Sequence, residues 1–133
     1  MQYLDELDLR KIGERKWRHL ADFRFLSDKY PGIFLVPKGH ETNLASIPEI
    51  FWRWFPPVGN YDEAAAIHDA GYDGSLLTIT GDRINTIKSV ADNLFYEALT
   101  TETLRHSRVG PIKARLMYEA VKRFGNYPVK EVR

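Results

Sequence analysis

The stretch that decides the fold is Asp62-Glu63-Ala64-Ala65-Ala66-Ile67-His68-Asp69-Ala70-Gly71-Tyr72-Asp73. Asp62 can cap a helix and Asp73-Gly74 can stop one, so the segment predicts a helix over residues 64–72. On that helix His68 and Tyr72 share one face, and Asp69 and Asp73 share the adjoining face, about 100° away. The three alanines before His68 allow another backbone to approach closely. We therefore expect a partner helix within side-chain reach of His68.

The partner is expected to be a longer helix over residues 82–101, whose apolar residues keep a three-four spacing. It places Asp92 among apolar neighbours, and a buried carboxylate is costly unless it is paired or hydrogen-bonded. An imidazole N–H or a tyrosine hydroxyl from the facing helix would satisfy it. A histidine oriented in this way keeps its other nitrogen as a base near neutral pH.

The residues outside this helix pair predict the rest of an α+β fold. Short apolar runs at residues 23–25 and 33–36, separated by the turn-forming segment 27–32, indicate a β-hairpin, with a third short strand near residues 41–44. A further helix is expected to begin near Pro48. A last helix is expected over residues 111–124, with one apolar stripe formed by Ile112, Leu116, Ala120 and Phe124.

Strands first and helices afterwards predict a small antiparallel sheet followed by three to four helices. The length favours a single domain over residues 1–133, with a β-rich part at 17–45 and a helical part at 46–125 that carries the site.

The composition excludes several classes of function. The chain has 133 residues, a net charge of +1 and no cysteine. Without cysteine there is no disulfide framework, thiolate zinc site, Fe–S cluster or cysteine nucleophile. Without a surplus of basic residues we expect no nucleic-acid partner. The acidic start of the sequence and the absence of a long apolar run predict a protein made in the cytoplasm, with no signal peptide and no membrane span.

Two further groups of residues have their own predictions. Phe51, Trp52, Trp54 and Phe55 cannot all face one side of a helical turn, so at least one is expected to be exposed or to contact another element. His19 and His106 are expected at the surface. The last third of the chain is basic, which predicts a solvated face or an attraction to anionic lipid.

Three motifs together resemble the catalytic core of phospholipase A2. They are Pro57-Val58-Gly59-Asn60, then Ala64-Ala65-Ala66-Ile67-His68-Asp69-x-x-Tyr72, then Val90-Ala91-Asp92. The likeness is closest to the cysteine-free form found in parvovirus capsid proteins and spans about a third of the chain. It departs from the family at Pro56-Pro57, where those enzymes usually carry glycine.

The resemblance implies a calcium-dependent lipid-ester hydrolase. It implies that His68 is the base that activates water, that Asp92 orients it, and that Tyr72 supports Asp92. It also implies that Asp69 binds Ca²⁺ together with backbone of the loop at Pro57 and Gly59. The implied partner is a phospholipid or a membrane surface.

A second resemblance covers nearly the whole chain. It runs through Asn43-Leu44-Ala45-Ser46-Ile47-Pro48, Phe51-Trp52-Arg53, Phe55-Pro56-Pro57-x-Gly59, the His68-Asp69-x-x-Tyr72 and Ala91-Asp92-x-x-Phe95 motifs, and Met117-Tyr118-x-Ala120-Val121. This succession is similar to an uncharacterised family of small phage and prophage proteins. It implies a context, viruses of bacteria, but no established activity. We expect synthesis in the host cytoplasm, with a later place in the virion or at the host membrane.

Two alternatives stay open at this stage. In the first, the His–Asp pair is structural and the chain is a non-enzymatic phage protein, either a virion or tail accessory or a binder of a host factor. In the second, the order His40, His68-Asp69, Asp92 belongs to a metal-dependent phosphohydrolase of the HD type.

Overall fold

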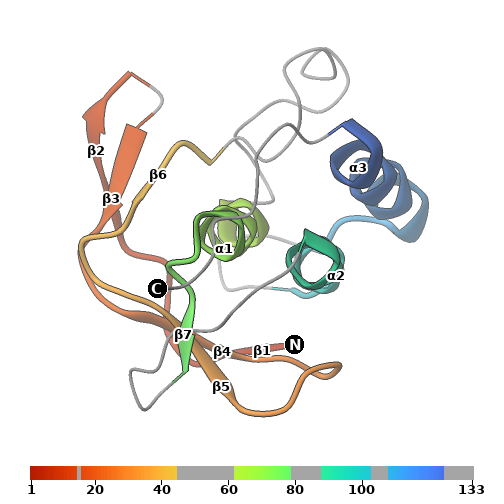
Figure 1. Cartoon of the computed structure of the whole chain (residues 1–133), viewed down its shortest axis with the longest axis horizontal. Coiled ribbons are helices and arrows are strands. Elements are labelled where there is room, and N and C mark those ends of the chain that lie inside the picture. Colours follow the sequence, from red (N-terminus) through yellow and green to blue (C-terminus); the bar gives the residue numbers. More distant parts are fainter. Residues whose placement is uncertain (15, 45–61, 79–87, 103–107, 125–133) are drawn as a thin grey trace.

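Two antiparallel sheets and three helices are described in the computed structural model, which covers residues 1–14, 16–44, 62–78, 88–102 and 108–124. Figure 1 shows the sheets on one side and the helices on the other. The strands are β1 (Gln2–Tyr3), β2 (Leu9–Gly13), β3 (Lys16–His19), β4 (Phe23–Leu26), β5 (Ile33–Val36), β6 (Glu41–Thr42) and β7 (Leu77–Thr78). The helices are α1 (Asp62–Asp73), α2 (Lys88–Leu99) and α3 (Pro111–Phe124). This arrangement confirms the α+β class.

The β4–β5 hairpin forms where the alternating apolar runs predict it. Phe23 and Phe25 are buried on one face of β4, and Phe25 lies directly opposite Phe34 of β5, with ring centroids 5.4 Å apart. The connecting turn contains Gly32 with a φ of 102°, a conformation that glycine adopts without the steric cost of a Cβ. The hairpin is the centre of a four-stranded sheet with the order β1-β4-β5-β7.

The sequence pattern did not reveal several short strands. β1 precedes the predicted β-rich part, and β7 lies in the segment expected to be a connector. A second, three-stranded sheet with the order β2-β3-β6 confirms the strand near residues 41–44 but also includes β2. Strands of two residues carry too few side chains to show an alternating pattern, so only pairing with a neighbour defines them.

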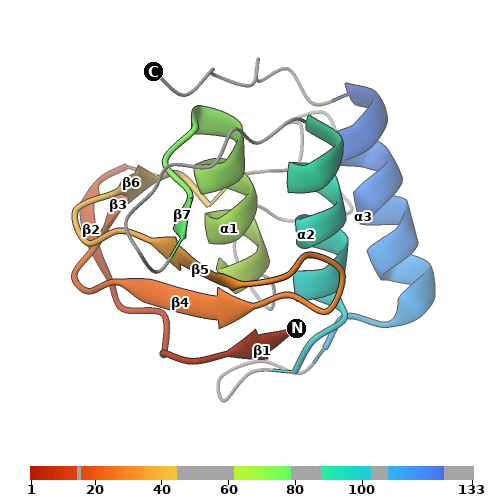
Figure 2. The same cartoon turned by 60° about the horizontal axis from the view of Figure 1, so that its bottom comes forward.

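Helices α1 and α2 form the predicted antiparallel pair, and α2 lies between α1 and α3 (Figure 2). Glu63 at the start of α1 and Thr101 just after α2 line the same pocket, as antiparallel helices require. Alanines 64, 65 and 66 are at most 1% exposed. Small side chains at these positions let the two helices approach closely. The helix expected to begin near Pro48, with its four aromatic residues, lies outside the described residues.

The predicted apolar stripe of α3 is wrong for two of its members. Ile112 is 79% exposed and Leu116 is 55% exposed, while the buried face consists of Ala114, Met117, Ala120 and Val121. Helical spacing groups Ile112 and Leu116 correctly with each other. It cannot say which side of the helix meets α2, because apolar residues occur all around this helix. The side chain of Phe124 is outside the description.

No helix in the described ranges is long and apolar enough to cross a membrane.

The reversed face of α3 gives a direct stability test. We expect Met117→Ala to lower the free energy of unfolding by about 2–5 kcal/mol, because it removes a fully buried side chain and leaves a cavity. The matched change on the neighbouring residue, Leu116→Ala, should cost less than about 0.5 kcal/mol. Urea unfolding followed by circular dichroism measures both. A larger loss for Leu116→Ala would contradict the observed orientation of α3.

Candidate active site

The structure brings His68 of α1 and Asp92 of α2 into direct contact. His68 Nε2 lies 2.7 Å from Asp92 Oδ1, a short distance typical of a charge-assisted hydrogen bond. The side chains are 1% and 2% exposed. This is the juxtaposition that the spacing of the two helices predicts. An Nε2–H that donates to the carboxylate leaves Nδ1 as the basic nitrogen of the ring.

Tyr72 completes the arrangement from the same face of α1, one turn after His68. Its hydroxyl donates a 2.7 Å hydrogen bond to the same Asp92 Oδ1, and its ring centroid is 4.1 Å from that of His68. Phe95 of α2 lies on another side of the imidazole, at 5.0 Å. Burial and then the hydrogen bond to Asp92 raise the pKa of Tyr72. The phenol therefore stays protonated and keeps donating to the carboxylate.

Asp69 lies on the adjoining face of α1, which is directed toward β6. Thr42 donates a hydrogen bond to its carboxylate. The Thr42 Oγ1 also accepts a 3.1 Å hydrogen bond from the backbone N–H of Leu44, whose φ is 56°. Burial is the largest effect on Asp69 and raises its pKa, and the nearby carboxylate of Asp73 raises it further. A cation bound beside Asp69 would oppose this and favour the ionised form.

A second His–Asp pair occupies the same face, and the sequence reasoning did not find it. His40 Nε2 lies 2.6 Å from Asp73 Oδ2, and the side chains are 6% and 32% exposed. Burial opposes ionisation of Asp73, but the hydrogen bond and charge of His40, with further bonds from Ser75, outweigh it and lower the Asp73 pKa. Helical spacing does place Asp69 and Asp73 on one face of α1. No sequence pattern, however, identifies His40 as the partner of Asp73.

His19 is buried rather than at the surface, which corrects the prediction for this residue. It is 1% exposed at the end of β3, and its ring lies 5.6 Å from that of His40. Among the residues that the structure describes, neither of its ring nitrogens has a hydrogen-bond partner. Burial and then the neighbouring His40 lower its pKa to about 4. His19 is therefore neutral at physiological pH. His106 lies outside the described residues.

The predicted metal ligands are Asp69 and the backbone at Pro57 and Gly59. Asp69 is described, whereas Pro57 and Gly59 lie outside the described residues. Among the described ranges no group of three His, Asp or Glu side chains is placed to hold a metal ion.

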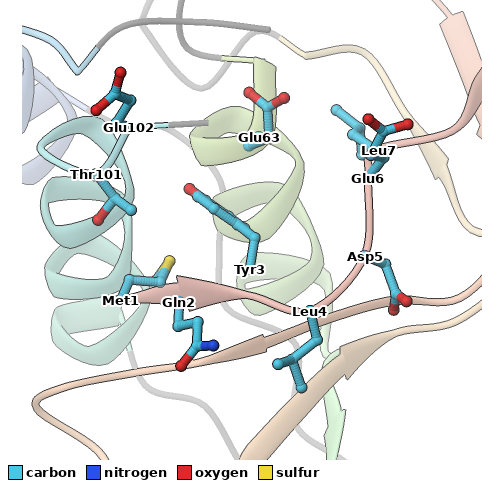
Figure 3. Close-up of a pocket in the computed structure, with 10 residues that line it drawn as sticks. All are labelled: Met1, Gln2, Tyr3, Leu4, Asp5, Glu6, Leu7, Glu63, Thr101 and Glu102. Carbon is cyan, nitrogen blue, oxygen red and sulfur yellow. The ribbon is translucent and has the colours of Figure 1, made fainter. Parts of the chain in front are cut away.

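A surface pocket of about 520 Å³ lies beside the N-terminal residues (Figure 3). It opens between the N-terminal strand segment, the start of α1 and the end of α2. It is lined by Met1, Gln2, Tyr3, Leu4, Asp5, Glu6, Leu7, Glu63, Thr101 and Glu102. His68 and Asp92 do not line it, and its four carboxylates would repel a phosphate group. The pocket is therefore a poor match for a phosphate-bearing ligand.

The fold and the site define an α+β protein with a buried histidine–aspartate–tyrosine arrangement between two antiparallel helices. The chain belongs to the family described as "Protein of unknown function (DUF1353)", which matches residues 17–121. The matched range contains both His–Asp pairs. No curated protein and no solved structure matches the chain.

The burial of His19 predicts how stability depends on pH. Between pH of about 6.5, where the unfolded histidine titrates, and about 4, the folded chain binds fewer protons than the unfolded chain. Stability should therefore decline as the pH falls through this window. Urea unfolding at pH 7 and pH 5 measures the decline. His19→Leu should reduce it, and an unchanged decline in that variant would contradict the assignment to His19.

Proposed function

We propose that the chain is a phage-encoded, calcium-dependent lipid-ester hydrolase of the phospholipase A2 type. One observation carries the proposal: Asp92 Oδ1 accepts from Tyr72 and lies 2.7 Å from His68 Nε2, with the three side chains on two antiparallel helices. A His–Asp contact with only a structural role would not require these motifs to follow one another in this order along the chain. Here the geometry agrees with the roles that the His68-Asp69-x-x-Tyr72 and Ala91-Asp92 motifs imply.

The chemistry follows from the arrangement of the imidazole. With the proton on Nε2 directed to Asp92, Nδ1 of His68 can take a proton from a water molecule as the water oxygen bonds to the ester carbonyl carbon. The negative charge of Asp92 stabilises the imidazolium that forms, and Tyr72 holds that carboxylate in place. The imidazolium then gives its proton to the departing alkoxide as the ester C–O bond breaks. The products are a fatty acid and a lysolipid.

Calcium is the expected cofactor, and the chemistry of Asp69 supports it in part. A carboxylate is a hard oxygen ligand of the kind that Ca²⁺ prefers, and Asp69 lies next to His68 in the sequence on the adjoining helix face. Backbone carbonyls near Pro57 and Gly59 would supply further ligands. Bound there, the ion would polarise the ester carbonyl.

The phage context of the proposal comes from the succession of motifs shared with small phage and prophage proteins. A hydrolase of lipid esters would serve a phage in crossing the host envelope or in damaging the membrane during lysis. Both roles place the protein first in the host cytoplasm and later at the host membrane or in the virion. The balanced charge supports a partner other than nucleic acid.

The burial of His68 favours a second candidate function. With the imidazole 1% exposed, a lipid reaches Nδ1 only after the residues around it move apart. A structural pair needs no such movement. In that case the chain is a non-enzymatic virion or tail accessory, or a protein that binds a host factor, and the His68–Asp92 pair fixes the spacing of α1 and α2.

The decisive measurement is fatty-acid release from mixed micelles of phospholipid and detergent in the presence of calcium. We expect release by the wild-type chain, loss of at least 10³-fold in His68→Ala, and a loss of about 10²-fold or more in Asp92→Asn. Because each change removes a partner from a buried pair, activity is compared only for variants that circular dichroism shows to be folded.

His40→Gln is the matched control, since it breaks the other histidine–aspartate pair, which is of similar length and whose aspartate lies on the same helix as His68. The proposal expects this variant to retain activity. An equal loss of fatty-acid release in His40→Gln and His68→Ala would indicate an HD-type centre or general damage to the fold. No release from any phospholipid, together with co-purification with a virion protein, would support the non-enzymatic function.

Calcium dependence has its own test. Calcium should raise the melting temperature of the wild-type chain and EDTA should abolish lipid hydrolysis, because an ion that binds only the folded state stabilises it. Asp69→Asn should remove the calcium-dependent rise while the variant remains folded. An identical rise in Asp69→Asn would exclude Asp69 as a ligand.

A further inference from the structure

The outward side of α3 carries apolar side chains that nothing in the described structure covers. Ile112 is 79% exposed and Leu116 is 55% exposed, the highest values among the exposed large hydrophobic residues of the described ranges. On a helix of 3.6 residues per turn, residues 112, 116 and 123 lie within about 40° of one another. We call the surface formed by Ile112, Leu116 and Arg123 the α3 outer face. Glu119 lies at its edge, within about 20° of Ile112, and forms ion pairs there with Arg115 and Arg123. It lies opposite the buried Ala114, Met117 and Val121.

Basic residues surround this face. The helix contains Lys113, Arg115, Lys122 and Arg123 and a single acidic residue, Glu119. Glu119 forms ion pairs with Arg115 and Arg123 at 3.0 and 3.1 Å, but both arginines are more than 60% exposed, so these pairs are weak and leave the helix strongly positive. Arg108 adds another exposed cation just before the helix.

Tyr118 lies beside these cations. The Arg115 guanidinium and the Lys122 ammonium lie 5.2 and 5.7 Å from its ring centroid. Tyr118 also donates a 3.2 Å hydrogen bond to Asn93, the residue after Asp92 on α2. The positive side of α3 is therefore joined directly to the helix that carries the carboxylate of the candidate site.

We propose that the α3 outer face adsorbs to an anionic lipid bilayer, with Ile112 and Leu116 entering the boundary between headgroups and acyl chains while the basic residues contact lipid phosphates. A short helix with exposed aliphatic residues framed by Lys and Arg has the character of an interfacial helix. A protein partner is less well matched, since lysine is depleted at the centre of protein interfaces and two side chains make a small apolar patch. A nucleic acid offers nothing to the exposed aliphatic side chains.

The inference deepens the proposed function and rests on it for lipid as the partner. Adsorption without turnover is measured separately from hydrolysis, so either can fail alone. A chain that binds vesicles but releases no fatty acid would support adsorption through the α3 outer face and contradict the proposed hydrolase activity. An active chain that does not adsorb through α3 would support the hydrolase and contradict the proposal for the α3 outer face.

The test is co-sedimentation of the full chain with large vesicles of pure phosphatidylcholine or of equal parts phosphatidylcholine and phosphatidylglycerol. We expect binding to the anionic vesicles, strong weakening at 1 M NaCl and little binding to the neutral ones. The double change Ile112→Ser with Leu116→Ser should weaken binding at least tenfold, and Lys113→Glu at least fivefold. Both sites are exposed, so the variants should fold, as circular dichroism would establish.

Matched controls use similar residues elsewhere on the surface. Leu20→Ser removes another aliphatic side chain, 42% exposed, and Lys38→Glu reverses another exposed charge. Both should bind as the wild-type chain does. Equal binding by the Ile112/Leu116 double variant, or no binding of the wild-type chain to either vesicle, would overturn the proposal. So would a dimer in analytical ultracentrifugation that the double variant abolishes, because a second copy would then occupy the face.

Discussion

The carboxylate of Asp92 is the constraint on which the helical half of the structure depends. Removing one partner from a buried charged pair costs about 3–5 kcal/mol, so an unpaired Asp92 would threaten a domain of this size. His68 and Tyr72 both direct a polar group to one oxygen of this carboxylate. They can do so because α1 and α2 pack directly against each other, with small buried side chains in the first turns of α1. The apolar core that surrounds the helices includes Ile67, Leu94 and Phe95, so packing and polar satisfaction favour the same spacing.

The sequence predicted those parts of the structure that repeat a pattern over several turns or strand residues. The β4–β5 hairpin and the three described helices each carry such a pattern, and the contact of His68 with Asp92 follows from helical spacing plus the cost of a buried carboxylate. The short strands β1 and β7 carry no pattern. The orientation of α3 was misjudged, because Ile112 and Leu116 form as good a stripe as Met117 and Val121, and only contact with α2 decides between them.

The histidine–aspartate pairs show how much of a site lies beyond sequence reasoning. His68 and Asp92 are found because each lies on a long helix with a predictable face. His40 precedes a two-residue strand, and its pairing with Asp73 depends on how the sheet β2-β3-β6 meets α1. The burial of the neutral His19 depends on the same packing of this sheet against α1. The two pairs also differ in exposure, since Asp73 is 32% exposed and Asp92 only 2%. A carboxylate in contact with water tolerates the loss of its partner far better than a buried one.

The two polar faces of α1 have a consequence for how the chain can change during evolution. One residue inserted into the helix before Ile67 would rotate everything after it by about 100° relative to everything before it. His68 would then take the direction of Asp69, toward Thr42, and Ile67 would face Asp92. Both sets of contacts would be lost in one event, whereas a substitution affects a single contact. Relatives of this chain should therefore vary in the lengths of their connectors, and the register of α1 from Asp62 to Asp73 should carry no insertions or deletions.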